Sequence, residues 1–189
     1  MENKSMSKDE SLELISQMIG EAKRNFAKGG SFYFLLWGAV TAVCNFGHYT
    51  LIKIGFDQHY LIWLLTIPAA IITIVYITRG EREERVIRHL DRLHGKIWMG
   101  IAVCMIILIF FMQDLNYHIG PLVLLFTGIG TYASGQIIRY KPITLGGVTL
   151  WVGAVIAFQV PMVDQFLVSG ITVLIGYVVP GLMLKRIER

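Results

Sequence analysis

The chain has 189 residues, of which 54% are hydrophobic and 16% are charged, and its formal net charge is +4. A soluble domain typically carries about a quarter charged residues, so this composition excludes an ordinary soluble enzyme. The apolar residues are gathered into long runs, which is typical of a protein whose solvent is a lipid bilayer.

Residues 1–30 predict a cytoplasmic amphipathic helix. A capping-box pattern at residues 7–10 is followed by apolar residues spaced three and four apart, and Gly29 and Gly30 end the pattern. The segment lacks the apolar core of a secretory signal peptide. Its apolar stripe is a candidate partner-docking face, although the membrane surface or the helix bundle would also cover it. The stripe consists of Leu12, Ile15, Ile19 and Phe26.

Six apolar segments predict transmembrane helices, because a bilayer core about 30 Å thick requires about 20 mostly apolar residues per helix. We therefore expect an all-α, polytopic transmembrane domain over residues 31–189. The six segments lie at about residues 31–52, 60–77, 97–112, 119–138, 143–160 and 166–184.

Lys and Arg fall almost entirely on one side of the predicted membrane. Of the 17 cations, only Lys53 lies in a loop on the other side, together with Asp57, Asp114 and Asp164. Cytoplasmic loops hold the excess of Lys and Arg, so both termini are predicted to be cytoplasmic. Because the basic residues border the spans and face anionic lipid, the expected partner is the lipid bilayer and not nucleic acid.

Residues 79–95 predict a charged cytoplasmic helical loop. Glu81 with Arg85, and Glu84 with Arg88, are spaced four residues apart and support a helix. An apolar stripe continues from this segment into the third span. We expect it to be an extension of the third transmembrane helix with a solvated charged face.

A weak internal repeat suggests that the membrane domain consists of three helical hairpins. Trp37, Trp98 and Trp151 stand near the cytoplasmic start of the odd-numbered spans, and an aspartate follows in each outer turn. Trp is also enriched at membrane interfaces and Asp in turns, so the pattern has a second explanation. If the repeat is real, it predicts a compact bundle with an approximately threefold arrangement. The even spans are rich in small residues, which favours tight helix packing.

Candidate residues for chemistry are few. No Asp, Glu, Lys or Arg lies in the middle of a predicted span, which argues against a proton-coupled carrier. Polar side chains that would line an interior are Asn45, Gln136 and Gln159. A candidate polar or metal site at the outer turns consists of His48, Asp57, His59, Asp114, Asn116, His118 and Asp164. Imidazoles and carboxylates bind zinc and similar ions, but this spacing matches no metal signature, so no metal or cofactor is assigned.

The segment AKGGSFYFLLWG at residues 27–38, which joins the amphipathic helix to the six spans, resembles small bacterial inner-membrane proteins. The resemblance implies a location in the bacterial cytoplasmic membrane and transfers no catalytic residue. The chain contains no phosphate-binding loop, GxSxG or HExxH motif. We therefore lean away from an enzyme.

Three functions remain open at this point. The leading hypothesis is a non-enzymatic membrane scaffold or sensor whose cytoplasmic helices bind a protein partner or a second copy of the chain. The second is an oligomeric transporter or channel for a small solute or ion, with the small-residue even spans as its pathway. The third is a membrane enzyme with a His and Asp metal site at its outer face.

Overall fold

The computed structural model describes residues 29–79 and 85–188, and for residues 85–91 it describes the backbone alone. The amphipathic helix predicted before the first span, with its docking stripe, therefore lies outside the described residues. The centre of the charged segment 79–95 lies outside them as well.

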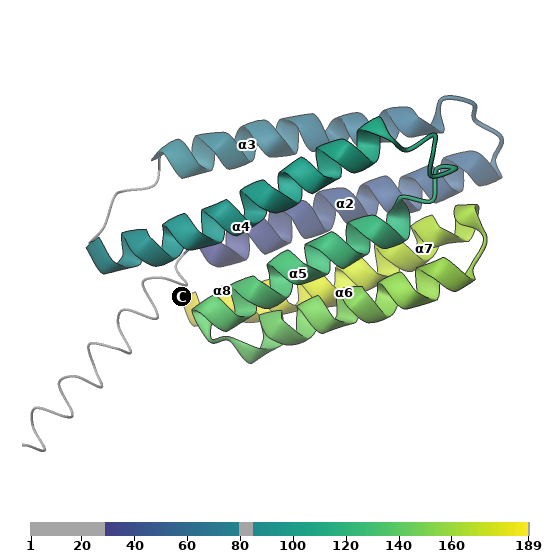
Figure 1. Cartoon of the computed structure of the whole chain (residues 1–189). Helices are drawn as coiled ribbons and strands as arrows, with labels where there is room; N and C mark the ends of the chain where they lie inside the picture. The colour runs from purple at the N-terminus through teal and green to yellow at the C-terminus, as the bar shows by residue number, and fades with distance from the viewer. Residues whose placement is uncertain (1–28, 80–84, 189) are drawn as a thin grey trace, which may run out of the picture.

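The described chain is all-α, and six of its helical segments are long and apolar enough to span a membrane (Figure 1). The second span joins η1 to α3, and the sixth joins α7, η2 and α8. The six predicted apolar helices are thus confirmed in number and approximate position. In chain order the elements are α2 (Gly30–Lys53), the 3₁₀ segment η1 (His59–Leu65), α3 (Thr66–Arg79), α4 (Arg85–Phe110), α5 (Gly120–Ile138), α6 (Lys141–Gln159), α7 (Met162–Val173), the π-helical turn η2 (Leu174–Val178) and α8 (Val179–Glu188).

Two boundaries are informative. α4 begins at Arg85, whereas its apolar span begins at Arg92, so the helix extends about two turns beyond the span, as the apolar stripe predicted. The sixth span begins at Met162, earlier than expected, and this places Asp164 in the first turn of α7 and not in a loop. A carboxylate is stabilised there by the positive end of the helix dipole.

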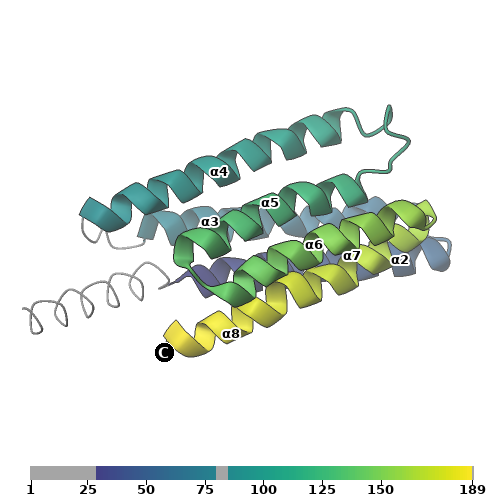
Figure 2. The same cartoon turned by 60° about the horizontal axis from the view of Figure 1, so that its bottom comes forward.

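The helices form a ring that is open on one side. α3 packs on α2, α2 on α7 and α8, α7 on α6, α6 on α5, and α5 on α4. Within the described residues no Cα atom of α3 lies within 8 Å of a Cα atom of α4. Figure 1 shows α3 along one edge of the bundle, and Figure 2 shows α4 along another. We call the space between them the α3–α4 opening. The expected threefold arrangement is therefore incomplete.

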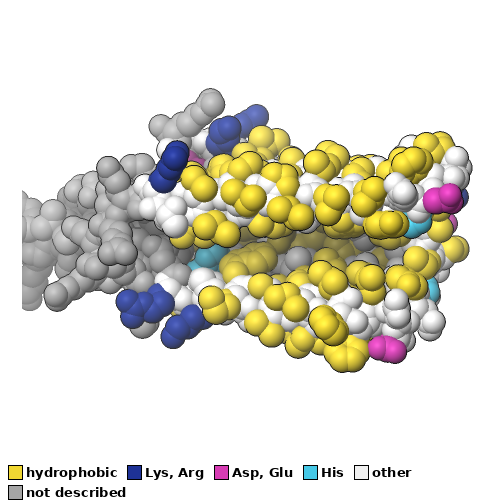
Figure 3. Space-filling view, turned by 90° about the horizontal axis from the view of Figure 1, so that it is seen from above, with side chains coloured by type: hydrophobic (Ala, Val, Ile, Leu, Met, Phe, Trp, Pro, Cys, Tyr) yellow, Lys and Arg dark blue, Asp and Glu magenta, His cyan; other side chains and the backbone are white. Residues whose placement is uncertain are grey.

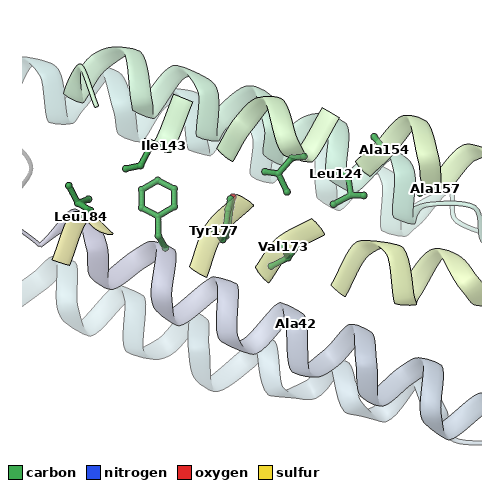
Figure 4. Packing of buried hydrophobic residues seen from close by; sticks show 10 residues of the cluster. Ala42, Leu124, Ile143, Ala154, Ala157, Val173, Tyr177 and Leu184 are labelled. Carbon is green, nitrogen blue, oxygen red and sulfur yellow. The ribbon is translucent and has the colours of Figure 1, made fainter. Parts of the chain in front are cut away.

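The core lies among α2, α5, α6 and the sixth span (Figure 4). Leu124, Ile143 and Leu150 are among its largest fully buried side chains. By contrast, Ala69 is the one buried residue of α3, and Ile101 is the one buried apolar residue of α4 among residues 92–110, whose side chains the structure describes. The two edge helices thus turn most of their apolar surface outwards, which a bilayer tolerates because lipid is as apolar as these side chains.

Glycines permit the closest helix contacts. A Cβ added to Gly135 of α5 would lie 2.4 Å from the backbone nitrogen of Thr144 in α6. One added to Gly146 of α6 would lie 2.2 Å from the carbonyl oxygen of Gly176 in η2. No side chain fits in either place, so the tight packing predicted from the small residues is confirmed at these crossings.

The π-helical turn η2 follows from a proline. Pro180 has no backbone N–H to donate to the carbonyl of Gly176, four residues earlier, so the regular α-helical bond cannot form there. The helix widens just before it, where the N–H of Val179 donates to the carbonyl of Leu174. Gly146 of α6 lies against the carbonyl oxygen of Gly176 in this turn.

Charge is sorted between the two ends of the bundle (Figure 3). We call the end with the cations of α3, α4, α5, α6 and α8 the basic end, and the other the opposite end, where Lys53, Asp57 and Asp114 lie. The basic end carries Arg79, Arg92, Lys96, Arg139, Lys141, Lys185 and Arg186.

The first and last described helices are joined at the basic end. The backbone N–H of Ser31 donates to Glu188 Oε1 at 2.9 Å, and the Ser31 hydroxyl donates to the other oxygen of the same carboxylate. Free N–H groups at a helix N-terminus favour a negatively charged partner. Glu188 therefore caps α2 from the far end of the chain.

Candidate functional site

His48, His59 and Trp63 form a hydrogen-bonded chain at the opposite end of the bundle. Trp63 Nε1 donates to His48 Nδ1 at 2.9 Å, and His48 Nε2 lies 3.0 Å from His59 Nδ1. His48 belongs to α2, whereas the other two side chains belong to η1. Two residues of the predicted outer site, His48 and His59, are thus brought together.

The proton positions in this chain follow from its donors and acceptors. An indole nitrogen can only donate, so His48 Nδ1 must accept and neutral His48 carries its proton on Nε2. That proton is donated to His59 Nδ1, which leaves the proton of His59 on its Nε2. Both ring nitrogens of His48 are used within the protein, so His48 has no free nitrogen for a metal ion.

His48 is held on a second side by an aromatic ring. It is 6% exposed, and its ring stacks on Phe166 of α7 with the centroids 4.0 Å apart. The stacking adds α7 to the contacts made by α2 and η1. His48 therefore acts as a joint between three elements, which is a structural role that its position in the sequence did not reveal.

His118 lies in a different contact. Gln165 Nε2 of α7 is 2.9 Å from His118 Nδ1 and donates also to the carbonyl of Val160 at 3.4 Å. Gln165 is 4% exposed, so its amide fixes the segment before α5 against the start of the sixth span. The structure thus joins His118 to Gln165, a residue that sequence reasoning did not select.

The other residues of the predicted outer site do not join these contacts. Asp57, Asp114 and Asn116 are exposed, and Asp164 is half-buried in the first turn of α7. Asn116 has a left-handed backbone with φ of 48°. Among the residues that the structure describes, no group of three or more His, Cys, Asp or Glu side chains could hold a metal ion.

The three residues predicted to line an interior lie in different environments. Asn45 is 6% exposed, and its amide donates to the carbonyl of Thr41 one turn earlier on α2 at 2.8 Å. Gln136 and Gln159 are exposed on α5 and α6. Only Asn45 therefore faces the interior of this chain.

A polar cluster that the sequence did not single out lies at the basic end. His94 Nε2 is 2.8 Å from Ser134 Oγ, and Trp98 Nε1 lies 3.0 Å from the same His94 nitrogen and 3.2 Å from Ser134 Oγ. Ser134 is fully buried and donates to the carbonyl of Gly130 at 2.7 Å. The sequence predicts a solvated charged face for the segment that contains His94, but His94 is half-buried and contacts α5. Its spacing of four residues from Trp98 is the one signal in the sequence for this contact.

The Ser134 and His94 pair lacks the surroundings of a nucleophile and its base. Ser134 Oγ already donates to a backbone carbonyl and can accept from Trp98, and burial keeps the hydroxyl away from any substrate. The cluster therefore joins α4 to α5.

No family model, no curated protein and no solved structure matches this chain.

Proposed function

We propose that this protein is a non-enzymatic scaffold or sensor of the bacterial cytoplasmic membrane, with both termini in the cytoplasm, that binds a protein partner through its cytoplasmic helices. The observation that carries the proposal is the use of its interior histidines. His48 and His94 both form hydrogen bonds that join neighbouring helical elements. We infer that these histidines stabilise the packing of the membrane domain.

The basic end supplies the second support. α4 extends about two turns beyond its apolar span, from Arg85 to Arg92. The positive-inside rule predicts that this end lies in the cytoplasm. The stripe at Leu12, Ile15, Ile19 and Phe26 would lie on the same side. A helix extension and an amphipathic segment on one side provide a surface for a protein partner.

The two alternative functions have less support. A transport pathway would need polar side chains along one route, but Gln136 and Gln159 are exposed and Asn45 bonds to its own helix. An outer-face metal enzyme would need three or more ligands at one point, and the described residues supply no such group. We therefore retain the scaffold or sensor as the proposed function.

The proposal is tested by photo-crosslinking in living cells of a strain that naturally carries the protein. A photoreactive amino acid is placed at Ile15 or Ile19 of the full-length chain, and crosslinked products are compared with those from Ser16 or Gln17 on the other face. We expect a discrete product of defined mass from the stripe positions only. Substituting Leu12 and Phe26 by Asp in the same chain should abolish it.

Membrane insertion of each variant is checked by carbonate extraction, so that a failure to insert is not mistaken for lost binding. Crosslinks that are equally abundant from Ser16 and Ile15 would contradict the proposal, since they would show contact without a specific face. Crosslinking to lipid alone at every stripe position would also contradict it, because the helix would then lie on the membrane.

A further inference from the structure

Two of the hairpins share one internal contact in the same register. Trp37 Nε1 of α2 donates to Thr73 Oγ1 of α3 at 3.1 Å, and Trp98 Nε1 of α4 donates to Ser134 Oγ of α5 at 3.2 Å. Each pair is 36 residues apart in the chain. Each hydroxyl also donates to the carbonyl four residues earlier. Around this contact, positions 61 apart are therefore equivalent on α2 and α4 and on α3 and α5.

The ring repeats one kind of contact between successive hairpins. The second helix of one hairpin packs on the first helix of the next, as α5 does on α6, and the sixth span packs on α2 in the same way. By this rule α3 should pack on α4, but within the described residues no Cα atom of one helix lies within 8 Å of a Cα atom of the other. The space-filling view shows a hollow between two rows of apolar side chains along this opening (Figure 3).

Comparison of the equivalent positions of α5 and α3 explains why α3 does not pack on α4. The face of α5 that meets α6 carries Gly128 and Gly135, where an added Cβ would lie 2.5 Å from Trp151 and 2.4 Å from Thr144. The equivalent positions of α3 hold large side chains. They are Ile67 and Ile74, with Ile71 between them, and all three are more than half exposed.

The other wall of the opening shows the same change. The face of α2 that meets the sixth span includes Gly38, where an added Cβ would lie 2.9 Å from Val178, and Ala42, which is 3% exposed. The equivalent residues of α4 are Met99, 70% exposed, and Val103, 51% exposed. Bulky residues thus replace small ones on both walls, so α3 and α4 cannot approach as closely as the other helices do.

Cations stand at one end of these walls. Arg92 and Lys96 precede Met99 at helical spacing on α4, and Arg79 ends α3 at the same end of the bundle. All three side chains are exposed. Long basic side chains near the end of a span reach the phosphates of the lipid headgroups.

We propose that the α3–α4 opening is a binding site for an anionic phospholipid, whose acyl chain lies between the two apolar walls and whose phosphate binds Arg79, Arg92 and Lys96. A transmembrane helix from a partner fits less well, because tight helix association in membranes uses small or polar residues and these walls hold Ile, Met and Val. An anionic lipid matches both features of the opening, because its flexible acyl chain fits the apolar walls and its phosphate fits the cations at one end.

The site is tested with the full-length chain purified in detergent and stripped of lipid. Native mass spectrometry then measures the binding of phosphatidylglycerol, phosphatidylcholine with the same acyl chains, and glycerol 3-phosphate. We expect phosphatidylglycerol to bind most tightly. The double variant Arg92→Gln with Lys96→Gln should weaken it about fivefold for each cation removed. Ile71→Trp, which fills the opening, should weaken both lipids.

The matched controls lie away from the opening. Lys185→Gln with Arg186→Gln removes two exposed cations at the same end, on α8, and Ile156→Trp enlarges an exposed residue of α6. Both should leave binding within about twofold of the parent, and circular dichroism shows whether each variant remains folded. Equal losses from the two double variants would overturn the proposal, since only net charge would then matter.

Two further results would overturn the site in different ways. Glycerol 3-phosphate bound as tightly as the lipid would show an anion site that no acyl chain occupies. A disulfide formed in membranes between Ile71→Cys in one copy and Val103→Cys in another would show that protein fills the opening. Failure of this site leaves the proposed scaffold or sensor function intact, because the crosslinking experiment probes residues 12–26.

Discussion

Trp63 donates its indole proton to His48 Nδ1 at 2.9 Å, and this one bond fixes the tautomers of both histidines beside it. With Nδ1 occupied as an acceptor, His48 has to donate from Nε2 to His59. The chain of bonds has a single direction, and it exists only while both imidazoles are neutral. The contact between α2 and η1 is therefore sensitive to an added proton.

Removing the acceptor at His59 should break this link. His59→Phe leaves the Nε2–H of His48 without its partner in the contact between α2 and η1. We expect hydrogen exchange of the η1 backbone in detergent micelles, measured at one pH, to be faster in this variant than in the parent.

A histidine at the other end of the molecule serves as the internal control. Trp98 Nε1 lies 3.0 Å from His94 Nε2 and 3.2 Å from Ser134 Oγ, and neither contact involves η1. Exchange at this end of α4 and α5 should therefore change little in His59→Phe. A loss of protection that is equal at both ends would mean that the substitution acts globally and not through the His48 and His59 pair.

Removing the Ser134 hydroxyl should destabilise the α4 and α5 contact. Ser134→Ala removes the buried oxygen that Trp98 Nε1 and His94 Nε2 both approach, and it leaves Trp98 only its contact with His94 Nε2 at 3.0 Å. The loss should cost about 0.5–1.5 kcal/mol, the contribution of a typical hydrogen bond. Thr73→Ala removes the equivalent acceptor of Trp37, but at a less buried position, so its cost should be smaller. The midpoint of thermal unfolding in detergent checks the order of the two variants. Equal midpoints would contradict the assignment of Ser134 as the more buried link.

Glycine-to-alanine substitutions should change stability in opposite directions at a close helix contact and at an open position of the bundle. Gly135→Ala places a methyl group 2.4 Å from the backbone of Thr144, and such overpacking typically costs about 1–3 kcal/mol. Gly100→Ala meets nothing within 4 Å and should stabilise α4 by about 0.5–1 kcal/mol, because alanine loses less backbone entropy in a helix. Chemical denaturation of both variants in one micelle system measures the difference in sign. A destabilised Gly100→Ala would show that α4 has a close neighbour at that point.

The sidedness of the protein is also directly testable. The cation distribution predicts a cytoplasmic C-terminus and an outer loop at Asp57. Green fluorescent protein fused after Arg189 should fluoresce in bacteria, and alkaline phosphatase inserted beside Asp57 should be active in the periplasm. The opposite pattern for both fusions would place the basic end outside the cell and remove the basis for a cytoplasmic partner.

Hydropathy was sufficient to predict the six spans, because a bilayer requires apolar segments of a fixed length. It could not predict which side each residue faces, because a helix that is apolar all round carries a weak periodic signal. Gln136 and Gln159 show this: they lie in spans as expected, but on the exposed side. The partners of His48 depend on how α2 and α7 are rotated against each other, and no local pattern encodes that rotation.

The repeated tryptophans carried more information than their interface chemistry suggested. Trp37 and Trp98 donate to equivalent hydroxyls, whereas Trp151 donates to the backbone carbonyl of Leu125. The similarity is therefore real between the first two hairpins, and the third departs from it. The equal 36-residue spacing of the two Trp–hydroxyl contacts cannot be recognised until the partners on the neighbouring helices are known.

The bond between Ser31 and Glu188 has a consequence for protein engineering. It brings the start of α2 and the end of α8 within hydrogen-bonding distance, so in a gene that omits residues 1–28 and their docking stripe a short linker can connect the two helices in a circularly permuted chain. The natural place to open the permuted chain is between α3 and α4, because no helix contact crosses that gap in the described residues. Such a permutant would keep every packed helix pair of the ring while releasing α3 and α4 from their covalent connection.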